Sequence, residues 1–217
     1  MIKLKFNPFE KKNNYANRGM NLENDINITN NYYNLKDIAI IYKKPTPIKV
    51  VNVEYPKVVI KEAYFSEPST LDYTGIYKNK YIEFDAKETK SKTSFPLSNI
   101  HNHQLNHINK ITKHGGIAFL IVRFSTLNKN YLLEATKLLD FINNNDRKSI
   151  PLEYFEQNSY LIEQKYTPRL DYIKIIDKII NSKGCWKKWK LRLRRKKYLI
   201  KNQNQQRLNL KENGGKN

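Results

Sequence analysis

Residues 70–90 read TLDYTGIYKNKYIEFDAKETK, and this stretch carries the strongest fold signal in the chain. Apolar and polar residues alternate on both sides of a region with Gly and Asn, which predicts two strands joined by a hairpin. Alternation places Phe84 toward the core and Asp85 and Lys87 on the opposite face of the second strand. The hairpin also brings Asp72 beside Asp85. Two carboxylates and a lysine are therefore predicted to meet at one edge of a sheet.

The rest of the chain alternates between strand and helix patterns. The run at 117–124, IAFLIVRF, is almost unbroken in its apolar character, as expected for a strand covered on both faces. Further strands are predicted at 38–44, 48–56, 57–65 and 131–135, and helices at 19–34, 99–114, 136–145 and 167–184. This order predicts the α/β class, with a mixed sheet flanked by helices.

Composition indicates a polyanionic partner. The 217 residues contain 40 Lys and Arg but 20 Asp and Glu, a net charge of +20. No apolar run approaches the roughly 20 residues that span a bilayer, so nucleic acid is favoured over a membrane. The single cysteine, Cys185, excludes an intrachain disulfide and is typical of a soluble, cytoplasmic protein.

The charge distribution suggests three regions. We predict a mobile basic arm over 1–16, a folded domain over 17–181, and a basic, disordered extension over 182–217. Ten Lys or Arg lie between Lys183 and Lys201, without an acidic residue among them. Such a stretch suits phosphate contacts, although a membrane-surface helix or a solubilising end has the same composition.

The acidic cluster suits a magnesium-dependent nuclease. Carboxylate oxygens are the ligands that Mg²⁺ prefers, and a neighbouring lysine can orient water or stabilise charge on the phosphate. The acid-x-Lys pattern occurs five times in the chain, and most of these matches suit ordinary surface charge. The pair formed by Asp85 and Lys87 alone combines a predicted strand with a second acid at hairpin distance.

Longer strings add a family resemblance. NRGMNLENDINITNNYY (17–33), IAIIYKKPTPIKVVNVEYPK (38–57), IKEAYFSEPSTLDYTGIYKNKYIEFDAKETKSKTSFPL (60–97), RFSTLNKNYLLEA (123–135) and RKSIPLEYF (147–155) resemble the RecU family of Holliday junction resolvases. The resemblance implies a restriction-endonuclease-like fold and a homodimer that resolves four-way DNA junctions by paired symmetric nicks. It also implies Mg²⁺, with Mn²⁺ as an alternative metal, and partnership with a recombinase and a branch-migration helicase.

The same resemblance implies roles for individual residues. It assigns metal binding to Thr70, Asp72, Asp85 and Gln104, and the transition-state-stabilising role to Lys87. One departure concerns the catalytic strand, where the family resembles DFEAKET and this chain has EFDAKET. Asp85 thus stands in for a glutamate that is one methylene longer. We expect activity to survive this change.

Other polar residues have two interpretations each. Glu83 is either a carboxylate that supports the site or an exposed edge charge. Three histidines, His101, His103 and His107, suggest either a zinc site or, more simply, a polar helix face near DNA. Arg123 is either a phosphate contact or a member of a structural ion pair.

Expected DNA contacts lie outside the acidic cluster. They are Arg18, Lys43, Lys44, Arg194 and Arg195. The segment 45–69 resembles the stalk of the family, which is thought to enter the opened junction. Its Val-rich alternation alone predicts simply a two-stranded ribbon.

Two further functions remain alternatives to the resolvase. One is a catalytically weakened protein that binds junction DNA through its basic surface. The other is a nuclease of the same superfamily that reads a DNA sequence, as restriction enzymes do.

Overall fold

The computed structural model describes residues 22–57, 59–66 and 70–182. The arm predicted at 1–16 and the extension predicted at 182–217, apart from Ser182, lie outside the described residues. The chain divides into two compact units, 1–171 and 172–217. The described part of the second unit contains a helix at 173–182, within the predicted range.

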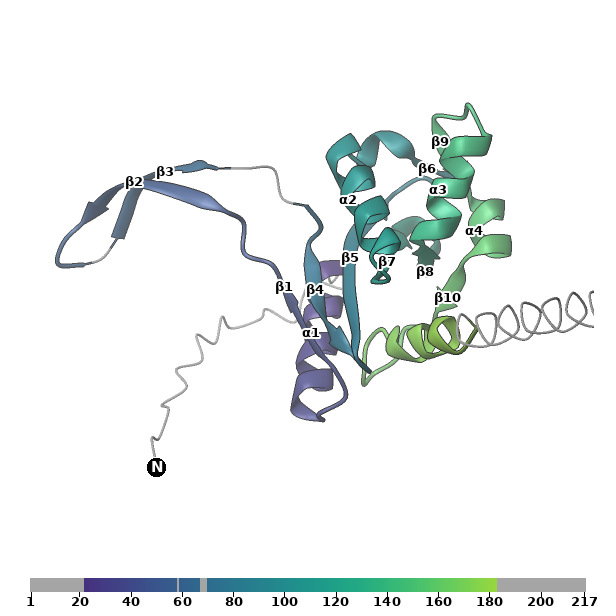
Figure 1. Ribbon diagram of the computed structural model, residues 1–217, viewed down its shortest axis with the longest axis horizontal. Helices are drawn as coiled ribbons and strands as arrows, with labels where there is room; N and C mark the ends of the chain where they lie inside the picture. The colour runs from purple at the N-terminus through teal and green to yellow at the C-terminus, as the bar shows by residue number, and fades with distance from the viewer. Residues whose placement is uncertain (1–21, 58, 67–69, 183–217) are drawn as a thin grey trace, which may run out of the picture. The chain divides into compact units, whose positions relative to one another are not determined.

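The first unit contains a mixed set of helices and strands (Figure 1). Its helices are α1 (Leu22–Leu35), α2 (Asn102–Lys113), α3 (Ala135–Asn144) and α4 (Leu152–Asn158), with 3-10 turns η1 (Leu97–Asn99) and η2 (Ser125–Leu127). Its strands are β1 (Ile40–Lys43), β2 (Ile48–Glu54), β3 (Val59–Phe65), β4 (Tyr73–Tyr77), β5 (Lys80–Thr89), β6 (Ser94–Pro96), β7 (Ile117–Phe124), β8 (Lys129–Glu134), β9 (Ser149–Pro151) and β10 (Tyr160–Ile162).

Six strands form the main sheet, in the order β1-β4-β5-β7-β8-β10. The central pair, β5 and β7, is parallel, and every other neighbouring pair in this sheet is antiparallel. Helix α2 connects the two parallel strands, as a parallel crossover requires. The predicted mixed sheet flanked by helices is therefore confirmed.

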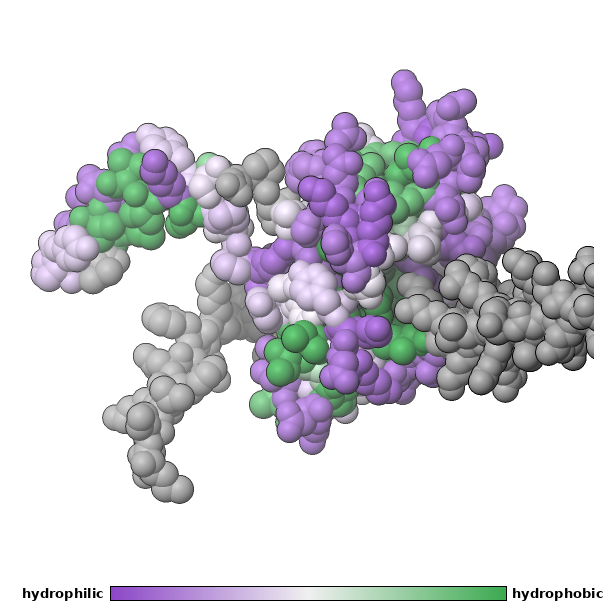
Figure 2. All heavy atoms as spheres, viewed as in Figure 1, coloured by the Kyte–Doolittle hydropathy of each residue, from purple (hydrophilic) through white to green (hydrophobic). Residues whose placement is uncertain are grey.

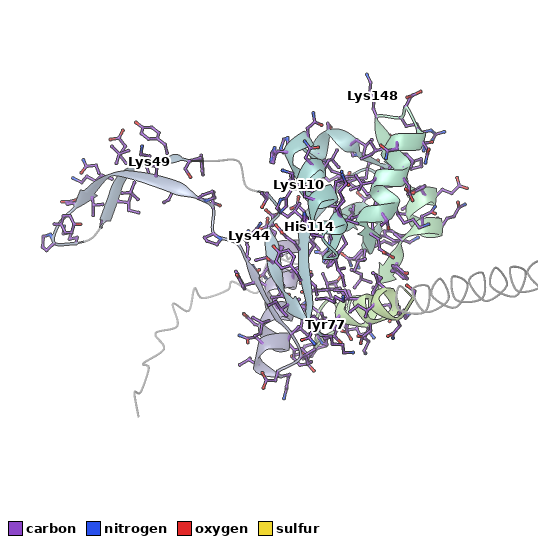
Figure 3. The ribbon with its side chains drawn as sticks, viewed as in Figure 1. Lys44, Lys49, Tyr77, Lys110, His114 and Lys148 are labelled. Atoms are coloured by element: carbon purple, nitrogen blue, oxygen red, sulfur yellow. The ribbon has the colours of Figure 1, made fainter. Side chains whose placement is uncertain are left out.

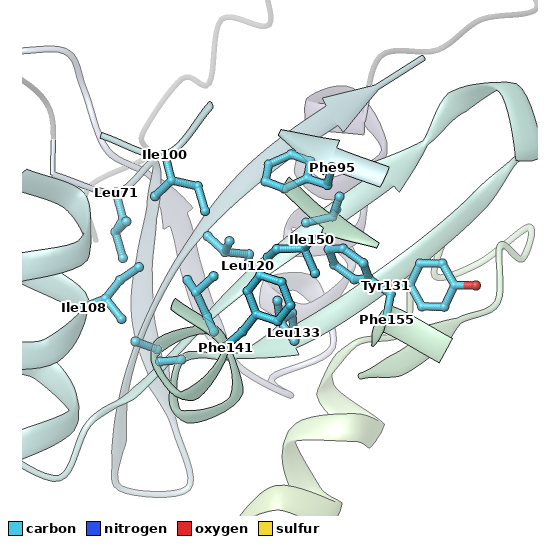
Figure 4. Close-up of a cluster of buried hydrophobic side chains, with 14 of the residues drawn as sticks. Leu71, Phe95, Ile100, Ile108, Leu120, Tyr131, Leu133, Phe141, Ile150 and Phe155 are labelled. Atoms are coloured by element: carbon cyan, nitrogen blue, oxygen red, sulfur yellow. The ribbon is translucent and has the colours of Figure 1, made fainter. Parts of the chain in front are cut away.

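Both faces of the central strands are covered. All eight residues of β7 are buried, because α2 and α3 contact it from one face and aromatic rings pack on the other. On the α2 face, side chains such as Ile108, Leu120 and Phe141 belong to the hydrophobic core (Figure 4). On the other face, Tyr73, Phe84 and Phe119 stack in series, with ring centroids 4.8 and 4.7 Å apart.

Helix α1 is attached to the sheet by a buried ion pair. The helix predicted at 19–34 is confirmed, and its residues Leu22, Ile26, Thr29 and Tyr33 form a buried face. Asp25 of α1 lies 2.6 Å from Arg123 Nη2 of β7, and both side chains are buried. Arg123 Nε also donates to Asn130 Oδ1 at 2.6 Å. Arg123 is therefore part of a structural ion pair, and its alternative interpretation as a phosphate contact is wrong.

The β4–β5 hairpin has the turn chemistry that the sequence suggested. Lys78 and Asn79 both have positive φ, 45° and 58°, the backbone that a tight two-residue hairpin turn requires. Gly75 of β4 allows β1 to approach closely, because a Cβ there would lie 2.1 Å from the carbonyl oxygen of Ile40. The turn sets the register between β4 and β5, and Gly75 allows β1 to pair with β4.

Strands β2 and β3 form a separate two-stranded antiparallel ribbon within the predicted stalk. Apolar side chains gather on it (Figure 2), and Val51, Tyr55, Tyr64 and Phe65 are each more than half exposed. An isolated two-stranded ribbon with exposed apolar groups is typical of a surface that contacts a partner.

None of the helices within the described ranges is long and apolar enough to cross a membrane.

Candidate active site

Asp72 and Asp85 lie beside each other at the open end of the β4–β5 hairpin, opposite its turn. Tyr73 is directly opposite Phe84 in the ladder, so Asp72, one residue before β4, comes opposite Asp85. Asp85 is fully buried and Asp72 is half-buried. The convergence predicted from hairpin spacing and strand alternation is confirmed.

Burial and the neighbouring Asp85 both raise the pKa of Asp72. Burial, together with a hydrogen bond to Asp85 and repulsion by its charge, raises the pKa of the Asp72 carboxyl from 3.8 to about 7. Lys87 and Lys43 act in the opposite direction but do not offset these effects. Two carboxylates that resist being charged together favour a cation between them.

Lys87 and Gln104 complete the surroundings of Asp85. Lys87 Nζ lies 2.8 Å from Asp85 Oδ2, and its side chain is about one-fifth exposed. Gln104 of α2 is buried and donates from Nε2 to the same oxygen at 2.8 Å. Gln104 Oε1 meanwhile accepts from the backbone N–H of His101 at 3.1 Å, so its amide also fastens the start of α2.

The other predicted ligand, Thr70, belongs to a neighbouring cluster around Glu83. Thr70 Oγ1 accepts from Lys44 Nζ at 2.5 Å and donates to Glu83 Oε1 at 3.3 Å. Lys44 also donates to Glu83. Among the described residues, Asp72, Asp85, Lys87 and Gln104 thus form one group, while Thr70 is oriented by Lys44 and Glu83.

Glu83 is a buried carboxylate with several donors. Its side chain is 1% exposed, so the interpretation as an exposed edge charge is wrong. Tyr81 OH donates to Glu83 Oε2 at 2.5 Å, and His107 Nε2 lies 3.0 Å from Oε1. Burial alone would raise the pKa of Glu83, but hydrogen bonds from Lys44, Tyr81 and His107 outweigh it and lower the pKa.

The remaining predicted residues have separate surroundings. Lys43 pairs with Glu23 of α1 at 2.5 Å, and both side chains are about two-fifths exposed. The predicted DNA contacts Arg18, Arg194 and Arg195 lie outside the described residues. His101 and His103 stack at 5.4 Å, while His107 points to Glu83. In the described ranges, no three His, Cys, Asp or Glu side chains come close enough to hold a metal together.

Sequence reasoning missed the extent of the Glu83 cluster. Strand alternation does place Tyr81 and Glu83 on the same face as Asp85, so these two members of the cluster were predictable. Lys44 and His107 come from distant parts of the chain, and only the fold brings them to Glu83. Lys44 was expected to contact DNA, and in the structure it lies at the junction between β1 and the β2–β3 ribbon (Figure 3).

The geometry suits phosphodiester chemistry. Two adjacent carboxylates provide hard oxygen ligands for a divalent cation of the Mg²⁺ type. A lysine on the same strand face supplies a positive hydrogen-bond donor next to them. The donor set thus fits such a cation.

Comparison with known proteins gives consistent matches. The family model "Recombination protein U" (RecU) matches residues 17–178. Holliday junction resolvase RecU of Geobacillus sp. (strain WCH70) is 52% identical over 178 residues, covering 79% of this chain and 88% of the relative. Its namesake from Geobacillus thermodenitrificans (strain NG80-2) is 53% identical over 171 residues, covering 76% and 85%.

A solved structure is also similar. Hjc, a Holliday junction resolvase of Archaeoglobus fulgidus, is 10% identical with a TM-score of 0.37, covering 64% of this chain and 93% of that one. This likeness is too weak to carry an argument.

Proposed function

We propose that this chain, which belongs to the RecU family, is an endonuclease that resolves four-way DNA junctions during recombination and repair. The observation that carries the proposal is the convergence of Asp72, Asp85 and Lys87 within the region that matches the family. The net charge of +20 supports a DNA substrate, because nucleic-acid binding depends on neutralising phosphates.

The two carboxylates would hold a divalent metal, Mg²⁺ or in its place Mn²⁺. Asp72 and Asp85 would bind it directly. Gln104 and Thr70 would join them as neutral oxygen ligands; for Gln104 this requires its amide to turn, because Nε2 now faces Asp85. When bound, the metal supplies an activated water and neutralises charge on the phosphate.

The chain's own residues provide positioning and charge. Lys87 would donate to an oxygen of the scissile phosphate as negative charge develops there. Its ion pair with Asp85 keeps the ammonium group at the site before DNA arrives. Before the metal binds, Gln104 restrains Asp85 from the α2 side, so that the carboxylate keeps one orientation.

Two cuts on a four-way junction require two such sites, and we infer a homodimer. The described part of each chain has one pair of site carboxylates. The uncovered part of the catalytic face has an apolar row across three strands, formed by Ile40, Ile76 and Tyr81. These side chains are 63, 59 and 45% exposed, and β1 is an edge strand. This row is the proposed dimer surface.

The biological setting follows from the family. A recombinase and a branch-migration helicase are the proposed partners, because a resolvase acts on the junctions that they form and move. The site of action is the cytoplasm, and the β2–β3 ribbon is proposed to be the stalk that enters the opened junction.

A substrate panel tests the function. Purified protein is incubated with an immobile four-way junction, a linear duplex of the same sequence and a mismatched duplex, each with Mg²⁺ or EDTA. We expect paired symmetric nicks in the junction with Mg²⁺, and intact DNA with EDTA.

Two results of this panel would support other functions. Junction binding without nicks in Mg²⁺ or Mn²⁺ would indicate the weakened binding protein, a reading favoured only by Asp85 in place of glutamate. Equal cleavage of the linear duplex at a fixed sequence would indicate a sequence-reading nuclease.

A further inference from the structure

Glu83 is surrounded by an unusually large number of polar side chains. Four side chains from four segments of the chain reach its two oxygens: Lys44, Thr70, Tyr81 and His107. The Glu83 side chain is 1% exposed. A buried carboxylate is costly unless charge and hydrogen bonds compensate it, so this cluster is held together strongly.

Two of these partners mark the ends of the β2–β3 ribbon. Lys44 directly follows β1, where the chain leaves the main sheet for the ribbon, and Thr70 stands between the ribbon and β4. Lys44 and Thr70 also contact each other, with Nζ and Oγ1 at 2.5 Å. In addition, the backbone N–H of Lys44 donates to the carbonyl oxygen of Asp72 at 2.7 Å. Both chain crossings at the base of the ribbon are thereby joined.

The same cluster borders the proposed active site. Glu83 precedes Asp85 by two residues on one strand, and both point to the α2 face, where His107 and Gln104 meet them. Thr70 precedes Asp72 by two residues. Movement of Lys44 or Thr70 would therefore displace the segment that carries Asp72 relative to Asp85.

We infer that Glu83 is a positioning residue that clamps the base of the β2–β3 ribbon to the catalytic strand and so keeps Asp72 beside Asp85. Lys44 acts inside the protein as the counter-charge of this clamp, rather than as a phosphate contact. The inference rests on the proposed function for its effect on cleavage. The clamp itself is a property of the fold.

Cleavage by three clamp variants tests the role. Single-turnover rates are measured at saturating junction and Mg²⁺ for Glu83→Gln, Lys44→Met and the double variant, and junction affinity is measured with EDTA. We expect each single change to slow cleavage on the order of tenfold while affinity changes less than about threefold, and the double variant to resemble the singles because the residues act as a unit.

Two further variants separate positioning from other roles. Lys44→Arg should recover most of the cleavage rate, because it restores the charge beside Glu83. Lys129→Met, which removes an exposed ion pair between β8 and Glu156 of α4, is the matched control and should cleave normally. A loss of junction affinity in Lys44→Met without a comparable loss of cleavage in Glu83→Gln would overturn the inference, as would normal cleavage by both.

Hydrogen exchange tests the clamp independently of activity. In Glu83→Gln, the amide of Lys44, which is bonded to Asp72, should exchange faster, while amides of β7 keep their wild-type rates. Unchanged exchange at Lys44 overturns the clamp even in an enzyme that cleaves junctions. An inactive wild-type protein would instead refute the proposed function, and exchange would still decide whether the clamp exists.

Discussion

At the residue scale, Lys87 and Asp85 have separable tasks. The carboxylate is a proposed metal ligand, whereas the ammonium group, 2.8 Å away, is a proposed donor to the phosphate. Their common strand face makes them neighbours, but each would act on a different part of the reaction. Substitutions should therefore affect metal binding and the chemical step differently.

Lys87→Ala should slow the chemical step while sparing the metal. Loss of a donor to developing charge costs on the order of 10²–10³ in rate for comparable sites. Asp72 and Asp85 remain, so the Mg²⁺ concentration for half-maximal rate should not rise. Single-turnover cleavage across a Mg²⁺ series measures both quantities. A rate near wild type, or a rate that excess Mg²⁺ restores, would contradict this role.

Local patterns predicted much of the site because its key contacts are local in sequence. Asp72, Asp85 and Lys87 belong to one hairpin, and strand alternation with turn spacing sets their placement. The contacts of Glu83 with Lys44 and His107 join residues 39 and 24 positions apart. Such pairings depend on β1 joining the sheet beside β4 and on α2 packing against β7, which no local pattern specifies. Alternation alone also left the burial of Glu83 open.

At the element scale, the chain's long elements were predictable and its short ones were not. Helix α1 repeats apolar residues at helical spacing over 14 residues, and β7 is an apolar run of eight residues, so both patterns are clear. Strands β6, β9 and β10 have three residues each and give no periodic signal. They form through long-range pairing, as between Phe95 and Ile150.

The attachment of α1 should depend on Asp25. Asp25→Asn keeps the shape but leaves the buried guanidinium of Arg123 without its charge partner. Breaking a buried pair in this way costs about 3–5 kcal/mol of unfolding free energy. Urea denaturation followed by circular dichroism measures the change.

A second acid on the same helix provides the control. Glu23→Gln removes an ion pair with Lys43 in which both side chains are about two-fifths exposed. Its effect should stay below about 1 kcal/mol, because exposed pairs contribute little. Equal effects of the two substitutions would mean that the Asp25 pair does not hold α1.

At the scale of the whole molecule, the arrangement of the sheet leaves an apolar row beside the catalytic face. Helices cover this face over β7 and β8, but Ile40 and Ile76 stay exposed on β1 and β4. A symmetric junction offers equivalent strands to two equivalent sites, and closed two-fold dimers are the commonest way to present them. In the proposed dimer, this exposed apolar row forms the contact between the subunits, and the two sites act on one junction.

Ile40→Lys and Ile76→Lys should each shift the protein from dimer to monomer at micromolar concentration, because a charge would be buried in the interface. Sedimentation velocity measures the assembly. Leu161→Lys on β10, an exposed position at the opposite edge of the sheet, is the matched control and should remain a dimer. A wild-type monomer, or dimers for all three variants, would contradict the proposed surface.

The proposed function depends on junction cleavage by the face of β5 that carries Asp85. Single-turnover cleavage of one four-way junction in Mg²⁺ by Asp85→Asn and by Glu88→Gln tests it most directly. Glu88 and Lys90 repeat the acid-x-Lys pattern, yet Glu88 is exposed and in the other strand phase. We expect that Asp85→Asn binds the junction but cleaves no faster than the EDTA background, while Glu88→Gln cleaves as wild type. Cleavage by Asp85→Asn at the wild-type rate, or loss of cleavage in Glu88→Gln alone, would show that the Asp85 face is not the catalytic face.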